Sequence, residues 1–225
     1  MTVSELHRKK PEPRYIVVEG PIGVGKTSLA ERLAESFHGE LLLEHVEENP
    51  FLERFYRSGR TSALPAQLFF LFQRARQMEE LRQSDLFTSV RIADFHIGKD
   101  RLFAEVNLDR EELALYGQIS DKLEIEAPQA DLVIYLQAPV DALLRRIARR
   151  GIPHERLIDR EYLERVTSAY ARYFHHFDES PLLIVNAASI DPVNNDADYE
   201  QLYDQVRRTT SGRHFFNPAA AMALA

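Results

Sequence analysis

Residues 15–28 read YIVVEGPIGVGKTS, and this stretch decides the fold of the chain. Its first five residues form a short β-branched run, apolar up to Glu19, that stops at glycine, which predicts a short buried strand of a parallel sheet. Residues 20–27 fit the pattern G-x-x-x-x-G-K-[ST], and apolar residues at helical spacing follow at Leu29, Leu33 and Phe37. A strand, a glycine-rich loop and a helix in this order predict a phosphate-binding loop.

The loop has physical reasons to bind the phosphates of ATP together with Mg²⁺. Its glycines let several backbone N–H groups converge, and the start of the helix adds positive potential. Lys26 would reach the outer phosphates, and the hydroxyl of Thr27 would bind Mg²⁺. A glycine-rich turn with a surface lysine is the plain alternative, but it does not require the flanking strand and helix. The predicted phosphate-binding residues are Gly20, Pro21, Ile22, Gly23, Val24, Gly25, Lys26, Thr27 and Ser28.

Short apolar runs alternate with helical patterns along the rest of the chain. Further strands are predicted at 41–44, 86–93, 132–136 and 182–185, and helices at 64–81, 139–150 and 160–176. Parallel strands need crossover helices, so this alternation predicts an α/β, P-loop NTPase-like three-layer fold with a five-stranded parallel sheet. We expect one domain at 15–210, a polar arm at 1–14 and a flexible tail at 211–225.

Composition excludes several classes of function. The chain has 225 residues, a net charge of −7 and 28 scattered Lys and Arg residues, which argues against binding to DNA or RNA. It has no cysteine, so disulfides and thiolate metal sites are excluded, and its eight histidines show no metal-ligand spacing. The polar residues 1–14 do not resemble a signal peptide and no apolar run could span a membrane, so we expect a cytoplasmic protein.

Two acidic residues stand at predicted strand ends. Glu44 closes the second strand and Asp94 the third, and the carboxyl ends of parallel strands share one edge with the phosphate loop. A kinase needs a base beside the acceptor hydroxyl, whereas a nucleotide hydrolase needs an acid that positions water. Each acid on its own is more often a solvated loop residue, so the pattern alone leaves the role open.

Several stretches together resemble the deoxynucleoside kinase family, which includes deoxycytidine, deoxyguanosine and deoxyadenosine kinases. They are residues 44–51, 67–74, 94–104 and 136–163, and the last is the most specific because it matches without a gap from Leu136 to Leu163. The resemblance implies a bacterial-type enzyme of nucleotide salvage that transfers the γ-phosphate of ATP to the 5′-hydroxyl of a deoxynucleoside. It also implies a homodimer paired through the helix at 64–81.

The resemblance implies roles for residues on both sides of the reaction. Glu44 would be the general base, and Asp94 would help Thr27 to hold Mg²⁺. Arg146 and Arg150 would close over the ATP phosphates as part of a lid, in preference to Arg145 and Arg149, although four arginines there are more often a solvated helix face. The implied catalytic residues are Lys26, Glu44, Asp94, Arg146 and Arg150.

The resemblance also implies a substrate pocket. Gln67, Arg74 and Asp100 would bind the nucleobase, and Tyr56 and Glu155 would bind the sugar 3′-hydroxyl, with Glu44 completing the set. Without the resemblance, Gln67 and Arg74 read as a solvated helix face, and Tyr56 as a core aromatic. The run at 46–51 favours a purine deoxynucleoside.

The chain departs from the family pattern at three positions. Phe95 and Ile152 stand where the family has arginines, and Asn49 stands near a common tryptophan, so that Phe51, Phe69 or Phe70 would line the pocket instead. Lys99 and Arg101 are the candidates to replace the charge missing at Phe95. The departures keep two alternatives open, namely a kinase for another small acceptor and a nucleotide sensor without transferase activity. Residues 187–216 form either an adenine-binding loop or a terminal helix.

Overall fold

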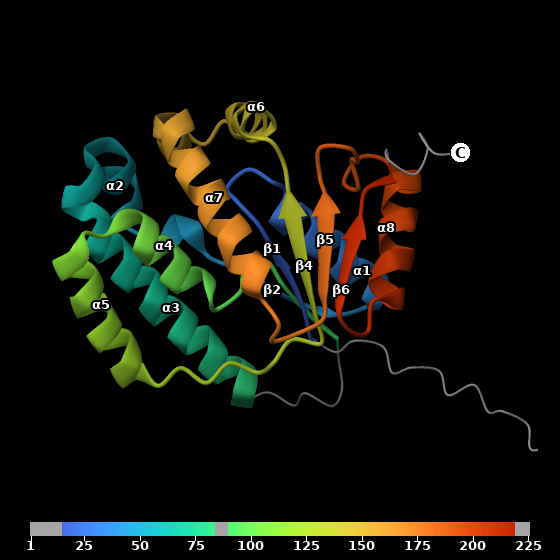
Figure 1. Ribbon diagram of the computed structural model, residues 1–225, viewed down its shortest axis with the longest axis horizontal. Helices are drawn as coiled ribbons and strands as arrows, with labels where there is room; N and C mark the ends of the chain where they lie inside the picture. The colour runs from blue at the N-terminus through green and yellow to red at the C-terminus, as the bar shows by residue number, and fades with distance from the viewer. Residues whose placement is uncertain (1–14, 84–89, 219–225) are drawn as a thin grey trace, which may run out of the picture.

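Six parallel strands form one sheet in the order β2-β3-β1-β4-β5-β6 (Figure 1). The computed structural model describes residues 15–83 and 90–218. The α/β architecture with a parallel sheet is therefore confirmed, but the predicted number of five strands is wrong. The strands are β1 (Tyr15–Glu19), β2 (Glu40–Leu42), β3 (Arg91–Ala93), β4 (Leu132–Gln137), β5 (Leu182–Asn186) and β6 (Arg213–Phe216).

The strand missed by the sequence analysis is β6. It pairs in parallel with β5, Leu182 opposite Arg213 and Val185 opposite Phe216, inside the segment assigned to a flexible tail. Its side chains are mostly exposed, and Phe215 is 71% exposed, so this edge strand lacks the apolar pattern of a buried strand. The tail prediction is thus wrong for residues 213–216. The predicted arm at 1–14 and the residues from 219 onward lie outside the described residues.

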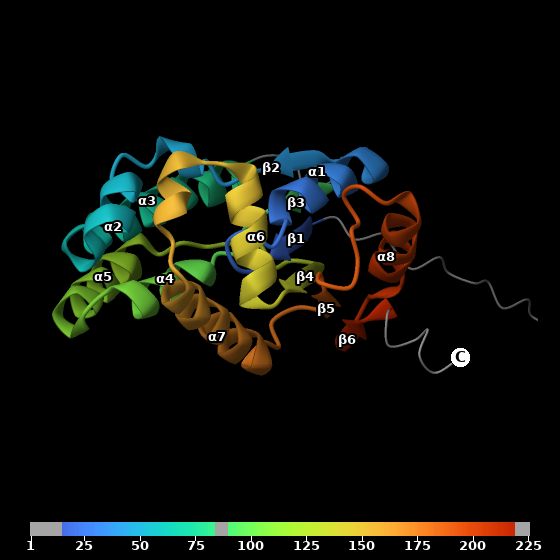
Figure 2. The same cartoon turned by 90° about the horizontal axis from the view of Figure 1, so that it is seen from above.

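Helices cover both faces of the sheet, which gives three layers. The helices are α1 (Lys26–Phe37), α2 (Leu52–Ser58), α3 (Ala63–Gln83), α4 (Lys99–Asn107), α5 (Arg110–Leu123), α6 (Val140–Arg150), α7 (Arg160–His176) and α8 (Asp196–Arg208). Short 3₁₀ turns lie at Val46–Glu48, Gly59–Ser62 and Pro153–Leu157. Figures 1 and 2 show α1 and α8 on one side of the sheet, and α7 together with the group α2 to α5 on the other. No helix in the described part of the chain is long and apolar enough to cross a membrane.

The two central strands carry the core. All five residues of β1 and the first five of β4 are buried, as expected for strands covered on both faces. Tyr135 of β4 stacks on Phe174 of α7 with ring centroids 4.2 Å apart. Burying an aromatic side chain of this kind stabilises the fold by about 1.5–3 kcal/mol. The loops that follow β1 and β4 therefore start from a rigid base.

One strand, β2, ends earlier than its sequence predicts, and β3 ends where it was predicted to end. β2 stops at Leu42, so Glu44 lies two residues beyond the strand, whereas β3 stops at Ala93 and Asp94 follows directly. The first residues of the strand predicted at 86–93 fall outside the described residues. Both acids still lie at the carboxyl edge of the sheet, as predicted.

Candidate active site

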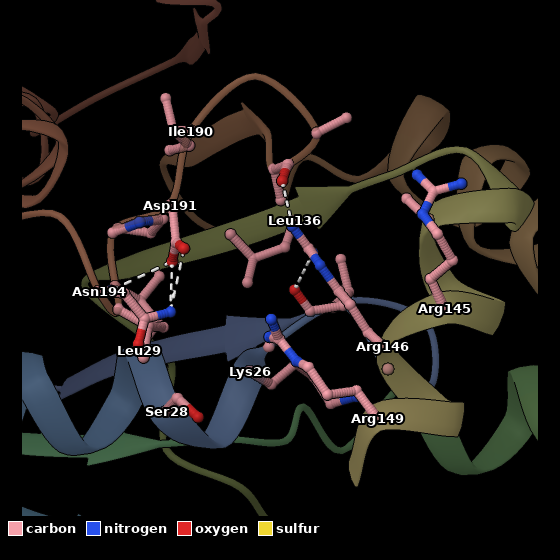
Figure 3. A pocket seen from close by; sticks show the side chains of 18 of the residues that line it. Lys26, Ser28, Leu29, Leu136, Arg145, Arg146, Arg149, Ile190, Asp191 and Asn194 are labelled. Atoms are coloured by element: carbon pink, nitrogen blue, oxygen red, sulfur yellow. Dashed lines mark hydrogen bonds between the residues drawn. The ribbon is translucent and has the colours of Figure 1, made fainter.

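The phosphate loop joins β1 to α1 through a backbone that requires glycine. Gly23 and Gly25 have φ of +80° and +103°, and a Cβ on Gly20 would lie 2.5 Å from the carbonyl oxygen of Leu136. Residues 23–28 line a cavity of about 1210 Å³, and Gly20, Pro21 and Ile22 form the turn that leads into it (Figure 3). The other walls are α6 and the loop at 187–194. The second half of the loop predicted from the sequence is therefore the floor of this cavity.

Lys26 lies at the start of α1 with its ammonium group turned back onto the loop. Its Nζ donates to the carbonyl oxygen of Gly20 at 2.8 Å. Burial lowers the pKa of Lys26 to about 8, and the positive charge of Lys99 adds to that lowering. The ammonium groups of Lys26 and Lys99 therefore lie near each other, although the two residues belong to α1 and α4.

Asp94 joins the phosphate loop to the loop that carries Glu44. One carboxylate oxygen accepts the hydroxyl hydrogen bond of Thr27 at 2.6 Å, and the other accepts the backbone N–H of Glu44 at 2.8 Å. A hydroxyl and a carboxylate at this distance are the hard oxygen ligands that suit Mg²⁺. No group of three or more His, Cys, Asp and Glu residues with metal-binding geometry occurs in residues 15–83 and 90–218. These ligands fit a Mg²⁺ that takes its remaining ligands from phosphate and water.

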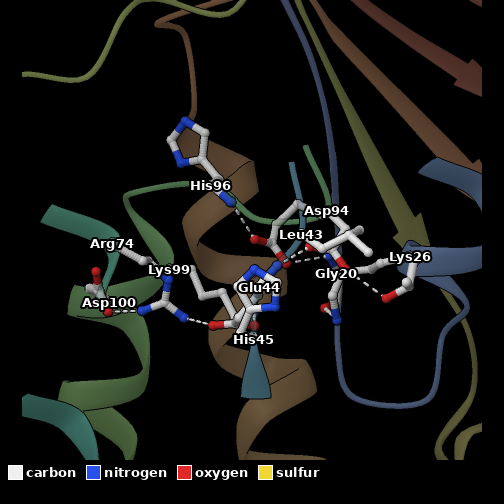
Figure 4. Close-up of polar contacts among 12 residues, drawn as sticks. Gly20, Lys26, Leu43, Glu44, His45, Arg74, Asp94, His96, Lys99 and Asp100 are labelled. Atoms are coloured by element: carbon white, nitrogen blue, oxygen red, sulfur yellow. Dashed lines mark hydrogen bonds and ion pairs between the residues drawn. The ribbon is translucent and has the colours of Figure 1, made fainter. Parts of the chain in front are cut away.

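Glu44 lies in a buried cluster of charges (Figure 4). Arg74 pairs with one of its carboxylate oxygens, and Lys99 Nζ lies 2.5 Å from the other. Arg74 also pairs with Asp100, and the four side chains are only 3–7% exposed. Burial tends to raise the pKa of Glu44, but the charges of Arg74 and Lys99 outweigh it and hold this pKa at about 2. Glu44 is therefore an ionised carboxylate held between two cations.

Arg74 and Asp100 present unused hydrogen-bonding groups in this cluster. Arg74 Nε and Asp100 Oδ2 are buried and have no hydrogen-bond partner among the described residues. Gln67, seven residues before Arg74 on the same face of α3, is 4% exposed, so the solvated-face interpretation of these two residues is wrong. The guanidinium of Arg74 also lies 5.2 Å from the ring centroid of Phe70. A donor, an acceptor and an aromatic ring are the groups that recognise a nucleobase.

Tyr56 and Glu155 come together from α2 and the turn at Pro153–Leu157. Burial raises the pKa of Tyr56 well above its usual value, and the nearby Tyr162 and Glu155 raise it further. Glu155 is buried, and its carboxylate binds Arg150, with Arg150 Nε 2.9 Å from Oε2. Arg150, predicted for the lid, therefore pairs with Glu155, predicted to bind the sugar 3′-hydroxyl.

All four arginines of α6 line the cavity, but they have different partners. Arg146 donates to the carbonyl oxygens of Val24 at 2.9 Å and Ala187 at 2.7 Å, so it ties the phosphate loop to the loop after β5 (Figure 3). Arg145 and Arg149 are the two whose guanidinium groups make no such bond within the described residues. The loop at 187–194 lines the cavity and α8 follows it, so residues 187–216 contain both a loop and a helix.

Three functional positions escaped the sequence analysis. Glu19 is 1% exposed, and its carboxylate accepts hydrogen bonds from Gly20 N at 2.8 Å, His96 N at 2.8 Å and the hydroxyl of Tyr170 at 2.9 Å. An acid ending a fully apolar strand was the available signal for this residue. Gln73 and Gln77 of α3 donate to the carbonyl oxygens of His45 and Leu43, on either side of Glu44. Glutamines inside a helix gave no such signal.

Asn49 takes a structural part in the same region. Its side chain donates to the carbonyl oxygen of Ala66 at 3.1 Å and accepts from the backbone N–H of Phe51 at 3.0 Å. The residue is 6% exposed. It therefore fastens the segment after Glu44 to α3.

This fold and this site define a P-loop phosphotransferase with a buried acidic group beside its phosphate loop. A sequence model of the deoxynucleoside kinase family matches residues 16–211. The chain is 36% identical over 200 residues to deoxyguanosine kinase of Bacillus subtilis, which covers 86% of this chain and 96% of that enzyme. The chain belongs to the deoxynucleoside kinase family, as the resemblance predicted.

Two further similarities agree with this assignment. Deoxyadenosine kinase of Lactobacillus acidophilus is 27% identical, over 81% of this chain and 89% of that enzyme. The structure of deoxyadenosine kinase from M. mycoides, with the products dCMP and dCDP bound, matches with a TM-score of 0.75 and 25% identity. That match covers 85% of this chain and 98% of the other. The relatives thus include kinases named for both purine deoxynucleosides.

Proposed function

We propose that this kinase transfers the γ-phosphoryl group of ATP to the 5′-hydroxyl of a purine deoxynucleoside. One observation carries the proposal: the Asp94 carboxylate binds Thr27 of the phosphate loop and the backbone of Glu44 at the same time. This contact would put the buried Glu44 next to the end of a triphosphate bound at the loop. An acceptor hydroxyl lying between Glu44 and the loop would be in line for phosphoryl transfer.

The chain's own residues have distinct parts in this reaction. A new bond forms between the 5′-oxygen and the γ-phosphorus, the bond to the β-phosphate oxygen breaks, and its electron pair leaves with ADP. Glu44 accepts the hydrogen bond of the 5′-hydroxyl and takes its proton as the new bond forms. Because the pKa of Glu44 is about 2, orienting the hydroxyl contributes more than drawing off its proton. When bound, Mg²⁺ held at Thr27 and Asp94 neutralises charge on the phosphates.

Cationic side chains would bind the donor. Lys26 would exchange the carbonyl oxygen of Gly20 for a phosphate oxygen. Arg150 would exchange the carboxylate of Glu155 for a phosphate oxygen. Arg146 would fix the phosphate loop through Val24, and Arg145 and Arg149 would face the triphosphate from the cavity wall. Their combined charge suits the charge that develops during transfer.

A purine would satisfy the unused groups around Arg74. Arg74 Nε needs an acceptor and Asp100 Oδ2 needs a donor, and a purine offers both along one edge. Gln67 can both donate and accept at another edge. Tyr56 would donate to the sugar 3′-hydroxyl, and Glu155, once Arg150 leaves it, would accept from that hydroxyl. The names of the bacterial relatives support a purine deoxynucleoside as the substrate class.

The direct test is nucleoside monophosphate formation from ATP and Mg²⁺ with each of four deoxynucleosides and four ribonucleosides. We expect product from deoxyguanosine or deoxyadenosine, and its loss in Glu44→Gln. A rate of ATP turnover that does not change when any nucleoside is added would favour a kinase for another acceptor. Tight nucleotide binding without any product would favour a sensor.

We also propose that two copies pair through α3 and α5. Phe72 of α3 is 48% exposed and Leu115 of α5 is 46% exposed, although both are large apolar side chains. Light scattering should then give the mass of a dimer for the wild type and of a monomer for Phe72→Glu. A monomeric wild type at micromolar concentration would contradict this pairing.

A further inference from the structure

Lys99 is a buried cation at the centre of the acceptor side. It is the first residue of α4, its side chain is 7% exposed, and its Nζ lies 2.5 Å from Glu44 Oε2. Glu44 is the one hydrogen-bond acceptor that its ammonium contacts in the described part of the chain. An ammonium has three N–H donors, so Lys99 keeps donors for a further partner. Burying an ammonium is costly unless its charge is paired and its donors are hydrogen-bonded.

The neighbouring cations are already engaged. Arg74 is shared between Glu44 and Asp100, and Lys26 donates to the phosphate loop. Arg101, two residues after Lys99, has a side chain that is 64% exposed and pairs with Glu105. Phe95 is 1% exposed and brings no charge. Lys99 is therefore the cation of α4 that faces the catalytic centre.

Lys99 also lies close to the donor side. The positive charge of Lys99 lowers the pKa of Lys26, whose ammonium donates to the carbonyl oxygen of Gly20 in the phosphate loop. Figure 4 shows Lys99 reaching from α4 toward Glu44, with Asp94 and Gly20 on the far side of that residue. The ammonium thus points to the region between the acceptor base and the phosphates.

We propose that Lys99 is a catalytic residue whose ammonium binds the phosphoryl group as it passes to the acceptor. This inference rests on the proposed kinase function. The bond from the 5′-oxygen to the γ-phosphorus forms while the bond to ADP breaks and leaves its electron pair on ADP. The hydroxyl proton goes to Glu44, and Lys99 keeps all its protons and gives only hydrogen bonds to the 5′-oxygen and a phosphoryl oxygen.

The physical reason is the place where charge develops. In phosphoryl transfer, negative charge spreads over the equatorial oxygens of the migrating group. A buried, fixed cation stabilises that charge more than a mobile surface cation does. Lys99 is fixed by Glu44 before substrate arrives, and the exposed Arg101 is not fixed in this way.

The experiment compares Lys99→Met, Lys99→Arg and the matched control Arg101→Ala by steady-state kinetics, substrate binding and thermal melting. We expect Lys99→Met to lower kcat by roughly 100-fold, as for other single donors to a developing charge. Its dissociation constants for ATP and nucleoside should change by less than about threefold, which is small on the scale of tenfold per 1.4 kcal/mol. Lys99→Arg should recover part of the loss, and Arg101→Ala should behave as wild type.

A second comparison separates contact with phosphate from a mere counter-ion role for Glu44. If Lys99 only neutralises Glu44, then Lys99→Met adds no loss to Glu44→Gln in single-turnover transfer. If it binds the phosphoryl group, the double variant is slower than Glu44→Gln alone. Should Lys99→Met fail to fold, Lys99→Gln serves for both measurements.

The outcomes keep the two proposals apart. A wild type that phosphorylates no nucleoside contradicts the kinase function itself. An active wild type whose Lys99→Met variant keeps kcat within threefold overturns the role of Lys99 alone. Equal loss from Lys99→Met and Arg101→Ala, or loss confined to nucleoside binding, overturns it as well.

Discussion

The donor side and the acceptor side of this site are built in opposite ways. The donor side is an open cavity of about 1210 Å³, floored by backbone groups of one continuous loop and lined by arginines. The acceptor side is a buried cluster of side chains from separate elements: Glu44 after β2, Arg74 of α3, and Lys99 and Asp100 of α4. Backbone N–H groups bind phosphate whatever the side chains are, whereas a cluster of side chains can be altered residue by residue to select a substrate.

The two sides meet at Asp94. Its carboxylate binds Thr27 on the donor side and the backbone of Glu44 on the acceptor side. The Glu19 carboxylate makes a parallel link, from Gly20 to His96 and Tyr170. A shift of the phosphate loop would therefore move the loop that carries Glu44, and the reverse.

The largest effect is expected where the two sides join. Asp94→Asn weakens the hydrogen bond from Thr27 and removes the charge proposed to hold Mg²⁺, so kcat/KM should fall by about 10³-fold for both substrates. Steady-state kinetics with varied ATP and varied nucleoside measure this. A loss confined to one substrate would show that the two sides are independent at Asp94.

A change in the acceptor cluster should leave the donor side alone. Asp100→Asn removes the carboxylate that pairs with Arg74, so the kcat/KM for the nucleoside should fall by roughly 100-fold while the KM for ATP changes less than twofold. The matched control is Glu105→Gln, an exposed acid on the same helix. An equal rise in the KM for ATP would break the distinction between the two sides.

The reverse test uses the cavity wall. Arg149→Ala removes an arginine that lines the cavity and has no described partner, so the KM for ATP should rise by about fivefold, as for a partly screened charge. The KM for the nucleoside should stay within the error of the assay. A shift in nucleoside KM instead would place Arg149 on the acceptor side.

The smallest effect is expected at the second link. Tyr170→Phe removes the hydroxyl that donates to Glu19, so the free energy of unfolding should fall by about 1 kcal/mol with activity largely kept. Urea unfolding, at unchanged slope, measures this difference. Loss of activity without loss of stability would mean that Tyr170 positions the phosphate loop.

The same contrast explains what the sequence could reveal. The loop at 20–27 is contiguous, its glycines are required by positive φ, and its strand is apolar except for Glu19, so the donor side was predictable from local pattern. Pairing of Glu44 with Arg74 and Lys99 depends on how α3 and α4 pack, which no local pattern contains. Only the family resemblance singled out Arg74 and Asp100, and Gln73 and Gln77 escaped it.

The position of β6 at the edge of the sheet explains why the sequence predicted five strands and not six. β6 has four residues and mostly exposed side chains, so its sequence differs little from that of a loop. It becomes a strand because β5 offers it an unpaired edge, a feature of the assembled sheet. Glu44 was expected at a strand end and lies two residues beyond, where Gln73 and Gln77 hold the loop.

The most direct test of the account is the ratio of ADP to deoxynucleoside 5′-monophosphate formed from ATP and deoxyguanosine or deoxyadenosine, in the wild type and in Glu44→Gln. We predict one monophosphate for each ADP in the wild type, and a loss of both products by roughly 10²–10³-fold in the variant. ADP without monophosphate, or monophosphate formation that is unchanged in Glu44→Gln, would contradict the claim that Glu44 serves the acceptor hydroxyl.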